Sequence, residues 1–420
     1  MEKYHWSYSE PINFFFSLKY LLLTHHLSKS SIKMTSTAPV KAGYWYCKGK
    51  LPPEDIDSNL FTHLFAAFVD VVIDTSTNTS KLNFPEGSDD KLKSFAKTVK
   101  IKNPKVKALL SIGGASTCRS IFSKIASQPT TRQQFIATSI EVAKSWHYDG
   151  LCLNLQYTNT RDLEEMTNLP ALLEDWRTAV DKEVPDPLLL TAAVFYSPEH
   201  YPIHAIKNCL DWINVVAYDL KTPVKTTLDP ITAPPAPLHN PIISTDRIIS
   251  VGVVVDAWID AGVPANKLVL GLPFHGFGWH LKNADNHEIS SPANQPTASE
   301  EMDPVLYRDI QEIIKDECGK EVIDHYYVTQ YCYVGTTWIG YDGKDIIFYK
   351  VIYAKQKKLL GYFAWHLDGD DSDWALSKQG NYFIIIIIYI NFCMFWISTL
   401  SNLIFTLNIY IVTAFQAWNK

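Results

Sequence analysis

Eight short apolar segments that alternate with helix-like stretches constrain the fold of this chain more than any other feature. The segments are rich in β-branched and aromatic residues, which favour strands, whereas the stretches between them repeat their apolar residues at close to helical spacing. Because strands and helices alternate, we predict a parallel sheet of the α/β class, and eight units predict a closed (β/α)8 TIM barrel over residues 40–379. The expected strands are 42–47, 63–71, 106–113, 150–156, 188–195, 212–218, 268–273 and 360–365, and the expected helices include 88–99, 131–146, 168–180, 245–261 and 345–356.

Two long excursions interrupt the alternation. Residues 275–338 are too many for one helix and contain a polar stretch, an amphipathic piece at 305–318 and a strand-like piece at 325–334. They predict a small α+β insertion between the seventh strand and its helix, on the barrel face whose loops carry function. The Pro-rich loop 222–241 follows the sixth strand, and the sequence leaves open whether it is a solvated loop or a wall of a cleft.

The fourth expected strand carries polar side chains where a barrel normally packs apolar ones. In residues 151–156, leucine alternates with Cys152, Asn154 and Gln156. Because strand side chains alternate between faces, the leucines are predicted to face the surrounding helices and the other three residues the barrel interior. Burying an amide without a partner costs on the order of 1–3 kcal/mol, so these amides indicate a site. An amide pair that satisfies itself inside the core is the alternative.

Other strands end in residues that suit the same site. Tyr44 lies in the first strand, Tyr218 and Asp219 end the sixth, and Trp365 ends the eighth. Each aromatic residue alone fits core packing better than a site, but the carboxyl ends of all the strands meet at one mouth of a barrel. Aromatic faces beside amide and carboxyl groups suit a sugar, which stacks its C–H face and gives its hydroxyl groups polar partners.

The charge balance and the cysteines narrow the class of ligand. Lys and Arg number 38 against 44 Asp and Glu, a net charge of −6, so the basic excess of a nucleic-acid-binding protein is missing and a neutral partner is expected. The seven cysteines are scattered and lack CxxC spacing, which indicates neither a zinc site nor a dense disulfide framework. One bridge between Cys318 and Cys332 stays open. We expect no metal ion and no other cofactor.

Several short motifs follow one another along the chain. They are SIGG at 111–114, DGL at 149–151, LLLTAAVFY at 188–196, AYD at 217–219, GLPF at 271–274, WIGYD at 338–342 and GYFAW at 361–365. Together they resemble glycoside hydrolase family 18, and within it the plant class V chitinases and the chitinase-related lectins. The resemblance spans roughly residues 40–371 and implies a TIM barrel whose α+β insertion deepens a chitin-binding cleft.

The chain departs from the family pattern at the residues that perform the chemistry. The family has three acidic residues in this strand, and Cys152, Asn154 and Gln156 stand in their places. The last is in the family a Glu that protonates the glycosidic oxygen while the N-acetyl carbonyl of the substrate attacks the anomeric carbon. Gln156 has no titratable proton and Asn154 no charge, so neither serves that reaction. Cys152 is expected to be an inert filler of an Asp-sized space.

Loss of charge leaves groups that can bind a glycan. The resemblance places Tyr44, Tyr218 and Trp365 in the sugar subsites and gives Asp219 a role in positioning the acetamido group, while Gln156 can still hydrogen-bond a sugar oxygen. The first hypothesis is a non-catalytic chitinase-like protein that binds chitooligosaccharides or related N-acetylglucosamine glycans. The second is an enzyme of this family with residual activity through Asp219 or water, or with redirected chemistry. The third is a decayed gene product without an independent role.

The segments at both ends do not fit the barrel. Residues 1–39 form an N-terminal extension with a poor secretion signal, since Glu2 and Lys19 interrupt it, and the sequence leaves open whether they belong to the mature fold. The family resemblance implies an extracellular or vacuolar protein, whereas translation from Met34 implies a cytoplasmic one.

Residues 380–413 are apolar enough to indicate a membrane span, and Asp, Glu, Lys and Arg are all absent between Lys378 and Lys420. The segment nevertheless separates residues 374–379 from 414–420, which together match one closing helix of the barrel. We therefore predict a translated intron at 380–413, with 414–420 as the remainder of that helix, and we do not expect membrane association.

Overall fold

The computed structural model describes residues 39–74, 79–114, 119–155, 163–199, 201–223, 229–240, 249–294 and 304–380. The chain divides into two compact units, Met1–Pro39 and Val40–Lys420, and every element below belongs to the second unit. The predictions for residues 1–38 and 381–420, and the prediction for Gln156, lie outside the described residues.

Eight parallel strands close into a barrel, which confirms the predicted (β/α)8 fold. The strand order is β1-β14-β8-β7-β6-β5-β4-β2, and β1 also pairs with β2, so the sheet closes on itself. The strands are β1 (Val40–Tyr46), β2 (His63–Asp74), β4 (Lys107–Ile112), β5 (Gly150–Leu155), β6 (Leu189–Val194), β7 (Trp212–Val215), β8 (Leu268–Pro273) and β14 (Gly361–Trp365).

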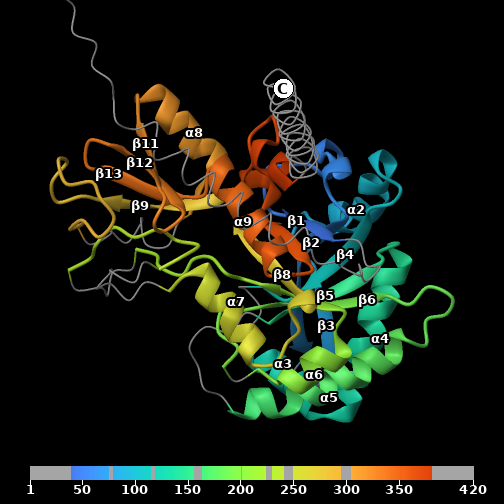
Figure 1. The fold of residues 1–420 in the computed structure, drawn as a ribbon. Coiled ribbons are helices and arrows are strands. Elements are labelled where there is room, and N and C mark those ends of the chain that lie inside the picture. The colour runs from blue at the N-terminus through green and yellow to red at the C-terminus, as the bar shows by residue number, and fades with distance from the viewer. Residues whose placement is uncertain are drawn as a thin grey trace, which may run out of the picture. The chain divides into compact units, whose positions relative to one another are not determined.

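Helices surround the strands on the outside of the barrel (Figure 1). Helix α2 illustrates why they form: Leu92, Phe95, Ala96 and Val99 repeat at helical spacing and are buried, with acidic residues in the first turn and lysines in the last. The α-helices are α2 (Asp89–Lys102), α3 (Arg119–Ser127), α4 (Pro129–Ser145), α5 (Leu163–Val180), α6 (Ile203–Cys209), α7 (Val251–Asp260) and α9 (Lys344–Gln356), and the short 3-10 helices are η1 (Pro53–Asp55), η2 (Ser58–Leu60), η3 (Ala265–Lys267) and η4 (Leu367–Gly369).

Several barrel elements differ from the predicted bounds, and the sixth expected strand ends at Val215 instead of residue 218. The helix expected at 245–261 begins at Val251, because the Ser250 side chain accepts a hydrogen bond from the backbone N–H of Val253 and caps the helix there. The second barrel strand continues to Asp74 and pairs with an antiparallel strand that the sequence did not indicate, β3 (Thr79–Asn83).

The insertion between β8 and α9 is a five-stranded antiparallel sheet with one helix. The sheet order is β10-β9-β13-β12-β11. The strand expected at 325–334 is divided, because residues 325–328 form the turn that joins β11 to β12. The elements are β9 (His275–His280), β10 (Val305–Leu306), α8 (Tyr307–Asp316), β11 (Lys320–Asp324), β12 (Thr329–Val334) and β13 (Thr337–Tyr341).

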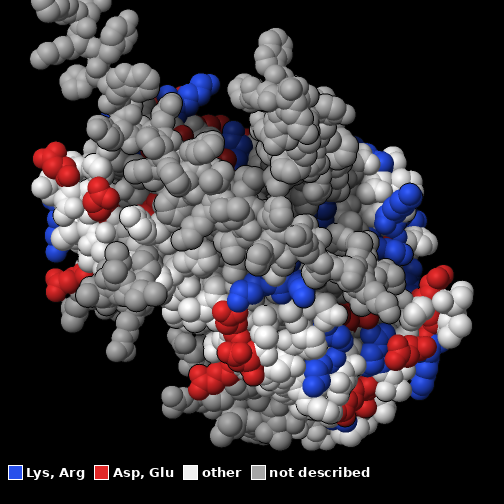
Figure 2. All heavy atoms as spheres, viewed as in Figure 1, with Lys and Arg blue, Asp and Glu red and all other residues white. Residues whose placement is uncertain are grey.

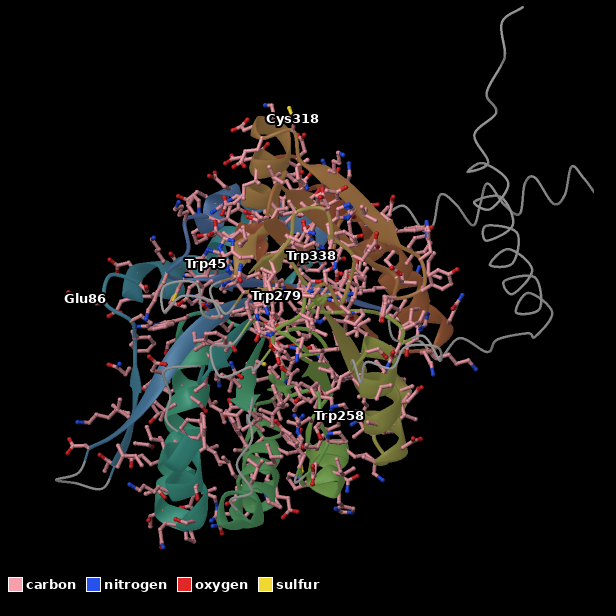
Figure 3. The ribbon with its side chains drawn as sticks, turned by 90° about the vertical axis from the view of Figure 1, so that its left-hand side faces the viewer. Trp45, Glu86, Trp258, Trp279, Cys318 and Trp338 are labelled. Atoms are coloured by element: carbon pink, nitrogen blue, oxygen red, sulfur yellow. The ribbon has the colours of Figure 1, made fainter. Side chains whose placement is uncertain are left out.

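The insertion has an aromatic core of its own. Trp279 and Trp338 are directly opposite across β9 and β13, and both are buried (Figure 3). The ring of Tyr331 stacks on Trp338 with 5.0 Å between the ring centroids. These rings fix the register of the sheet, because aromatic cross-strand neighbours favour one pairing.

The described part of the Pro-rich loop, residues 229–240, is mostly buried, so the solvated-loop alternative is wrong for this part. Ala233 and Ala236 are almost fully buried, and the backbone N–H of Leu220 donates to the carbonyl of Pro235 at 2.8 Å. Thr232 accepts a hydrogen bond from the backbone N–H of Ser291 at 3.0 Å, which ties the loop to the insertion.

The possible disulfide between Cys318 and Cys332 does not form in this structure. Cys318 is exposed after α8, at the outer end of the insertion (Figure 3), whereas Cys332 is buried in β12, and both are free thiols. The other described cysteines, Cys47, Cys152 and Cys209, are free and buried.

The described surface carries charges of both signs. In the view of Figure 2, basic and acidic side chains lie interspersed over the barrel helices. Within the described ranges, the helices are too short or too polar to cross a membrane.

Candidate functional site

The mouth of the barrel is the end at which the carboxyl ends of its strands meet. Strand β5 places Cys152 and Asn154 inside the barrel toward this mouth. All residues of β5 are buried. The Cys152 sulfur lies 3.4 Å from the Tyr44 hydroxyl of β1, across the barrel interior. The alternation in this strand therefore directs Cys152 inward. Gln156 would be the next inward residue and lies outside the described residues.

Cys152 is a protonated thiol in this setting. Burial raises its pKa, and hydrogen bonds to Thr191 and Tyr44 only partly oppose that rise. A thiol becomes a nucleophile when a positive group or a helix N-terminus lowers its pKa, and the opposite holds here. The side chain fills space in the barrel.

A hydrogen-bonded row of polar side chains extends from Tyr44 to β7. The Asn214 amide nitrogen donates to the Tyr44 hydroxyl at 2.7 Å, and the indole N–H of Trp212 donates to the Asn214 oxygen at 3.0 Å. Burial, with Cys152 beside it, raises the pKa of Tyr44 well above its usual value, so the phenol stays neutral. Sequence reasoning missed Asn214, although a lone amide in the apolar run of β7 was a signal.

Asn154 presents an amide oxygen that the described protein leaves unpaired. The residue is 8% exposed, and its Oδ1 has no hydrogen-bond partner among the described residues. An unpaired buried acceptor costs about 1–3 kcal/mol, which a ligand N–H or O–H would recover. Among the described side chains of β5, Asn154 therefore has the acceptor without a partner, and this oxygen is itself buried.

Gly113 allows the end of β4 to pass close to Asn154. Its φ is +93°, and a Cβ there would lie 3.2 Å from the Asn154 carbonyl oxygen and 3.1 Å from the Phe122 ring. A side chain at this position would be strained in conformation and in space. This explains the glycine in the 111–114 motif.

Trp365 ends β14 as a partly buried aromatic face. Its ring centroid lies 5.5 Å from that of Tyr44 and 5.4 Å from that of Phe68, and Tyr44 in turn stacks on Phe65 at 4.5 Å. The aromatic side chains expected at the mouth are thus packed against one another. Contacts of this kind hold the indole in one orientation, as a stacking surface requires.

Tyr218 and Asp219 follow β7 at the same mouth. Tyr218 is 4% exposed, and its ring lies 6.2 Å from that of Phe363, near the glycine of the 271–274 motif. Burial raises the pKa of Tyr218 well above its usual value, and the neighbouring Asp219 carboxylate adds to that rise. The phenol is therefore a neutral hydrogen-bonding group.

Asp219 is paired with a residue that sequence reasoning missed. His275 Nε2, in the first strand of the insertion, lies 2.8 Å from Asp219 Oδ1. His275 follows the C-terminal end of β8 by two residues, a place where barrels carry functional residues, so its position was a usable signal. In the part of the chain that the structure covers, no three His, Cys, Asp or Glu side chains are grouped to hold a metal ion.

Comparison with known proteins identifies one family. The model of the glycosyl hydrolases family 18 matches residues 40–370. A class V chitinase from Arabidopsis thaliana is 41% identical over 350 residues, which cover 81% of this chain and 89% of that relative.

Two crystal structures illustrate the range of similar proteins. One is a class V chitinase from Nicotiana tobaccum, solved as a glutamate-to-glutamine mutant in complex with NAG4, with a TM-score of 0.74 and 38% identity over 82% of this chain and 98% of that chain. The other is a chitinase-like agglutinin from Robinia pseudoacacia, with a TM-score of 0.72 and 40% identity over 81% of this chain and 98% of that chain.

Proposed function

Because this chain belongs to glycosyl hydrolase family 18, we propose that it binds N-acetylglucosamine oligomers at the mouth of its barrel without hydrolysing them. The observation that carries this proposal is β5, which presents a neutral thiol and a neutral amide inward where the family pattern has carboxylic acids. Cys152 is buried and protonated, and Asn154 offers an unpaired amide oxygen. With Gln156 as the next inward residue by sequence, this strand supplies no carboxylic acid to protonate a glycosidic oxygen.

The missing acids bear directly on the rate of hydrolysis. A general acid contributes about 10²- to 10⁴-fold to such reactions. Removing a carboxylate that stabilises a cationic intermediate costs a further factor, and the two losses need not add. Asp219 is the carboxylate beside Tyr218, but its Oδ1 already accepts from His275, so it is poorly suited to deliver a proton.

The binding groups support the other half of the proposal. Trp365 offers a stacking face, while Asn154 and Asp219 offer acceptors and Tyr218 a neutral hydroxyl. A relative that carries glutamine in place of a glutamate was crystallised with NAG4 bound. Another relative is named an agglutinin. The first shows that a relative with glutamine in place of a glutamate binds a glycan, and the name of the second indicates binding.

The first prediction concerns binding and turnover measured on one preparation. Calorimetry with the N-acetylglucosamine tetramer is expected to show binding, while chromatography of the same mixture is expected to show intact tetramer. The Cys152→Asp, Asn154→Asp, Gln156→Glu triple variant is expected to gain hydrolysis of at least about 10²-fold over the parent, because it regains the general acid and its charged neighbours.

The matched control is the Cys152→Ser, Asn154→Asp variant, which restores one charge but no proton donor at 156 and should stay inactive. Cleavage by the parent protein that survives Gln156→Ala would show an enzyme that uses another acid and would contradict the proposal. A folded triple variant that binds the tetramer without cutting it would show that the positions of the reacting groups have diverged as well.

A further inference from the structure

A buried histidine of the insertion holds the carboxylate at the barrel mouth. His275 is 4% exposed and the Asp219 side chain is 37% exposed, with 2.8 Å between Nε2 and Oδ1. The contact fixes one oxygen of Asp219 and leaves Oδ2 for a ligand. It also ties β9 of the insertion to the end of β7.

The hydrogen-bond partner of the imidazole is an acceptor, the Asp219 carboxylate. A hydrogen bond from a protonated ring to a carboxylate is charge-assisted and about twice as strong as one between neutral groups. The geometry therefore favours the imidazolium, which is doubly protonated.

The groups around His275 add to this preference. Asp342, at the end of β13, also lies close enough to favour the cation. Burial lowers the pKa of His366, after β14, to about 4, so that ring is neutral near pH 7. Tyr218 faces His275 edge-on at 5.8 Å and is neutral, and the positive Lys350 is paired with Asp342. Leu306 of β10 and the Phe277 ring complete the surroundings.

From this arrangement we propose that protonated His275 is a positioning residue for Asp219, and that glycan binding at the mouth weakens as rising pH removes the proton. This inference rests on the proposed function. When the imidazole is neutral, its contact with Asp219 loses the attraction between opposite charges and becomes a weaker hydrogen bond. Asp219 is then held less firmly at the mouth.

The direction of the pH dependence follows from the protonation balance. Burial lowers the pKa of His275, but the charge and hydrogen bond of Asp219, the backbone of Trp365 and the charge of Asp342 outweigh it and raise the pKa above the usual 6.5. The stabilisation from the imidazolium is thus fully present below that usual value and is lost as the pH rises through the raised pKa.

The second prediction combines calorimetry and NMR on the full chain. The affinity for the N-acetylglucosamine tetramer is expected to fall about threefold to tenfold between about pH 5.5 and about pH 8.5. In His275→Gln, the amide nitrogen takes the place of Nε2 and donates to Asp219 without titrating, so this variant is expected to bind with little change over the same range. His204→Gln makes the same change at an exposed histidine of α6 and should behave like the parent.

The NMR titration tests His275 independently of any glycan. The His275 imidazole is expected to titrate above 6.5 in the parent and at a lower pH in Asp219→Asn. Retention of the full pH dependence of binding in His275→Gln would overturn the inference, as would a His275 titration that Asp219→Asn does not change. If the tetramer binds at neither pH, the proposed function fails, and the NMR result alone decides the role of His275.

Discussion

Gly271 in β8 is the residue that lets the barrel strands carry large aromatic side chains at the mouth. A Cβ there would lie 2.6 Å from the Tyr218 ring, 2.7 Å from the Val215 carbonyl oxygen and 2.8 Å from the Phe363 ring. The flexible end of a side chain could yield to such a contact, but a strand carbonyl and two packed rings cannot.

The third prediction is that Gly271→Ala destabilises the fold by about 1–3 kcal/mol, the usual cost of overpacking a filled interior. The midpoint of urea unfolding measures this loss. Because the new Cβ would displace the Tyr218 ring, the variant is also expected to bind the tetramer more weakly.

Gly278→Ala is the matched control in β9. A Cβ at Gly278 would have open space around it, and its backbone is not left-handed. Its unfolding midpoint should stay close to that of the parent. If Gly271→Ala and Gly278→Ala unfold at the same urea concentration, the close contacts around Gly271 do not exclude a side chain there.

The alternation of strand side chains was sufficient to direct Cys152 into the barrel, because direction in a strand has a period of two residues. Its contact with Tyr44 was not predicted. The alternation also could not pair His275 with Asp219. These residues are 56 positions apart, on a barrel strand end and an inserted strand, and their distance depends on how the insertion packs. Asn214 was missed because one amide in a strand of four residues shows no alternation of polar and apolar side chains, unlike the polar residues of the fourth strand.

At the scale of elements, a buried ion pair joins α9 to the end of β13 and to the Pro-rich loop. The Lys350 ammonium contacts the Asp342 carboxylate and the Ala236 carbonyl, and both charged side chains are fully buried. Burial lowers the pKa of Lys350 and raises that of Asp342, and each charge opposes the shift of the other. One contact thus anchors three segments that are distant in sequence.

The fourth prediction is that Lys350→Met costs about 3–5 kcal/mol of unfolding free energy, because it leaves the Asp342 charge buried and unpaired. The double variant Asp342→Leu, Lys350→Met is expected to recover much of that loss, since well-packed apolar side chains can replace a buried pair. Denaturant unfolding of both variants measures the difference.

An exposed ion pair provides the control. Lys81 and Asp74 lie 2.9 Å apart in the β2–β3 hairpin, with the Lys81 side chain 62% exposed. Lys81→Met should change stability by less than about 1 kcal/mol. A similar small effect for Lys350→Met would mean that water reaches the buried pair.

Element boundaries followed the sequence where the pattern was regular. The seventh strand was predicted at 268–273 and lies there, because an apolar run between turn residues specifies a buried strand. The turn at 325–328 and helix α6 were missed because both are short, and a few residues carry too little periodicity to specify an element. The β3 strand was missed because it is also short and its residues are mostly polar, so it lacks the apolar pattern that indicates a strand.

At the scale of the whole molecule, the barrel remains packed up to the residue where the apolar segment begins. Gly380 contacts the Tyr362 hydroxyl of β14 closely enough that a side chain could not be accommodated. Residues 375–380 are helical. The chain therefore reaches residue 380 as part of the helix that follows the eighth strand, and a helical continuation is expected from the sequence of 414–420.

The fifth prediction is that a chain with Gln379 joined directly to Ala414 is expressed as a soluble monomer with the same tetramer affinity as the full chain. The reason is that residues 380–413 lack charge and carry long β-branched and aromatic runs, which favour aggregation. Size-exclusion chromatography and calorimetry measure both properties. Replacing 380–413 by a Gly/Ser segment of equal length separates the effect of composition from that of interrupting the helix.

A transcript that joins the codons of Gln379 and Ala414 would establish the intron. A native protein that is soluble at full length and whose mass includes the segment would refute it.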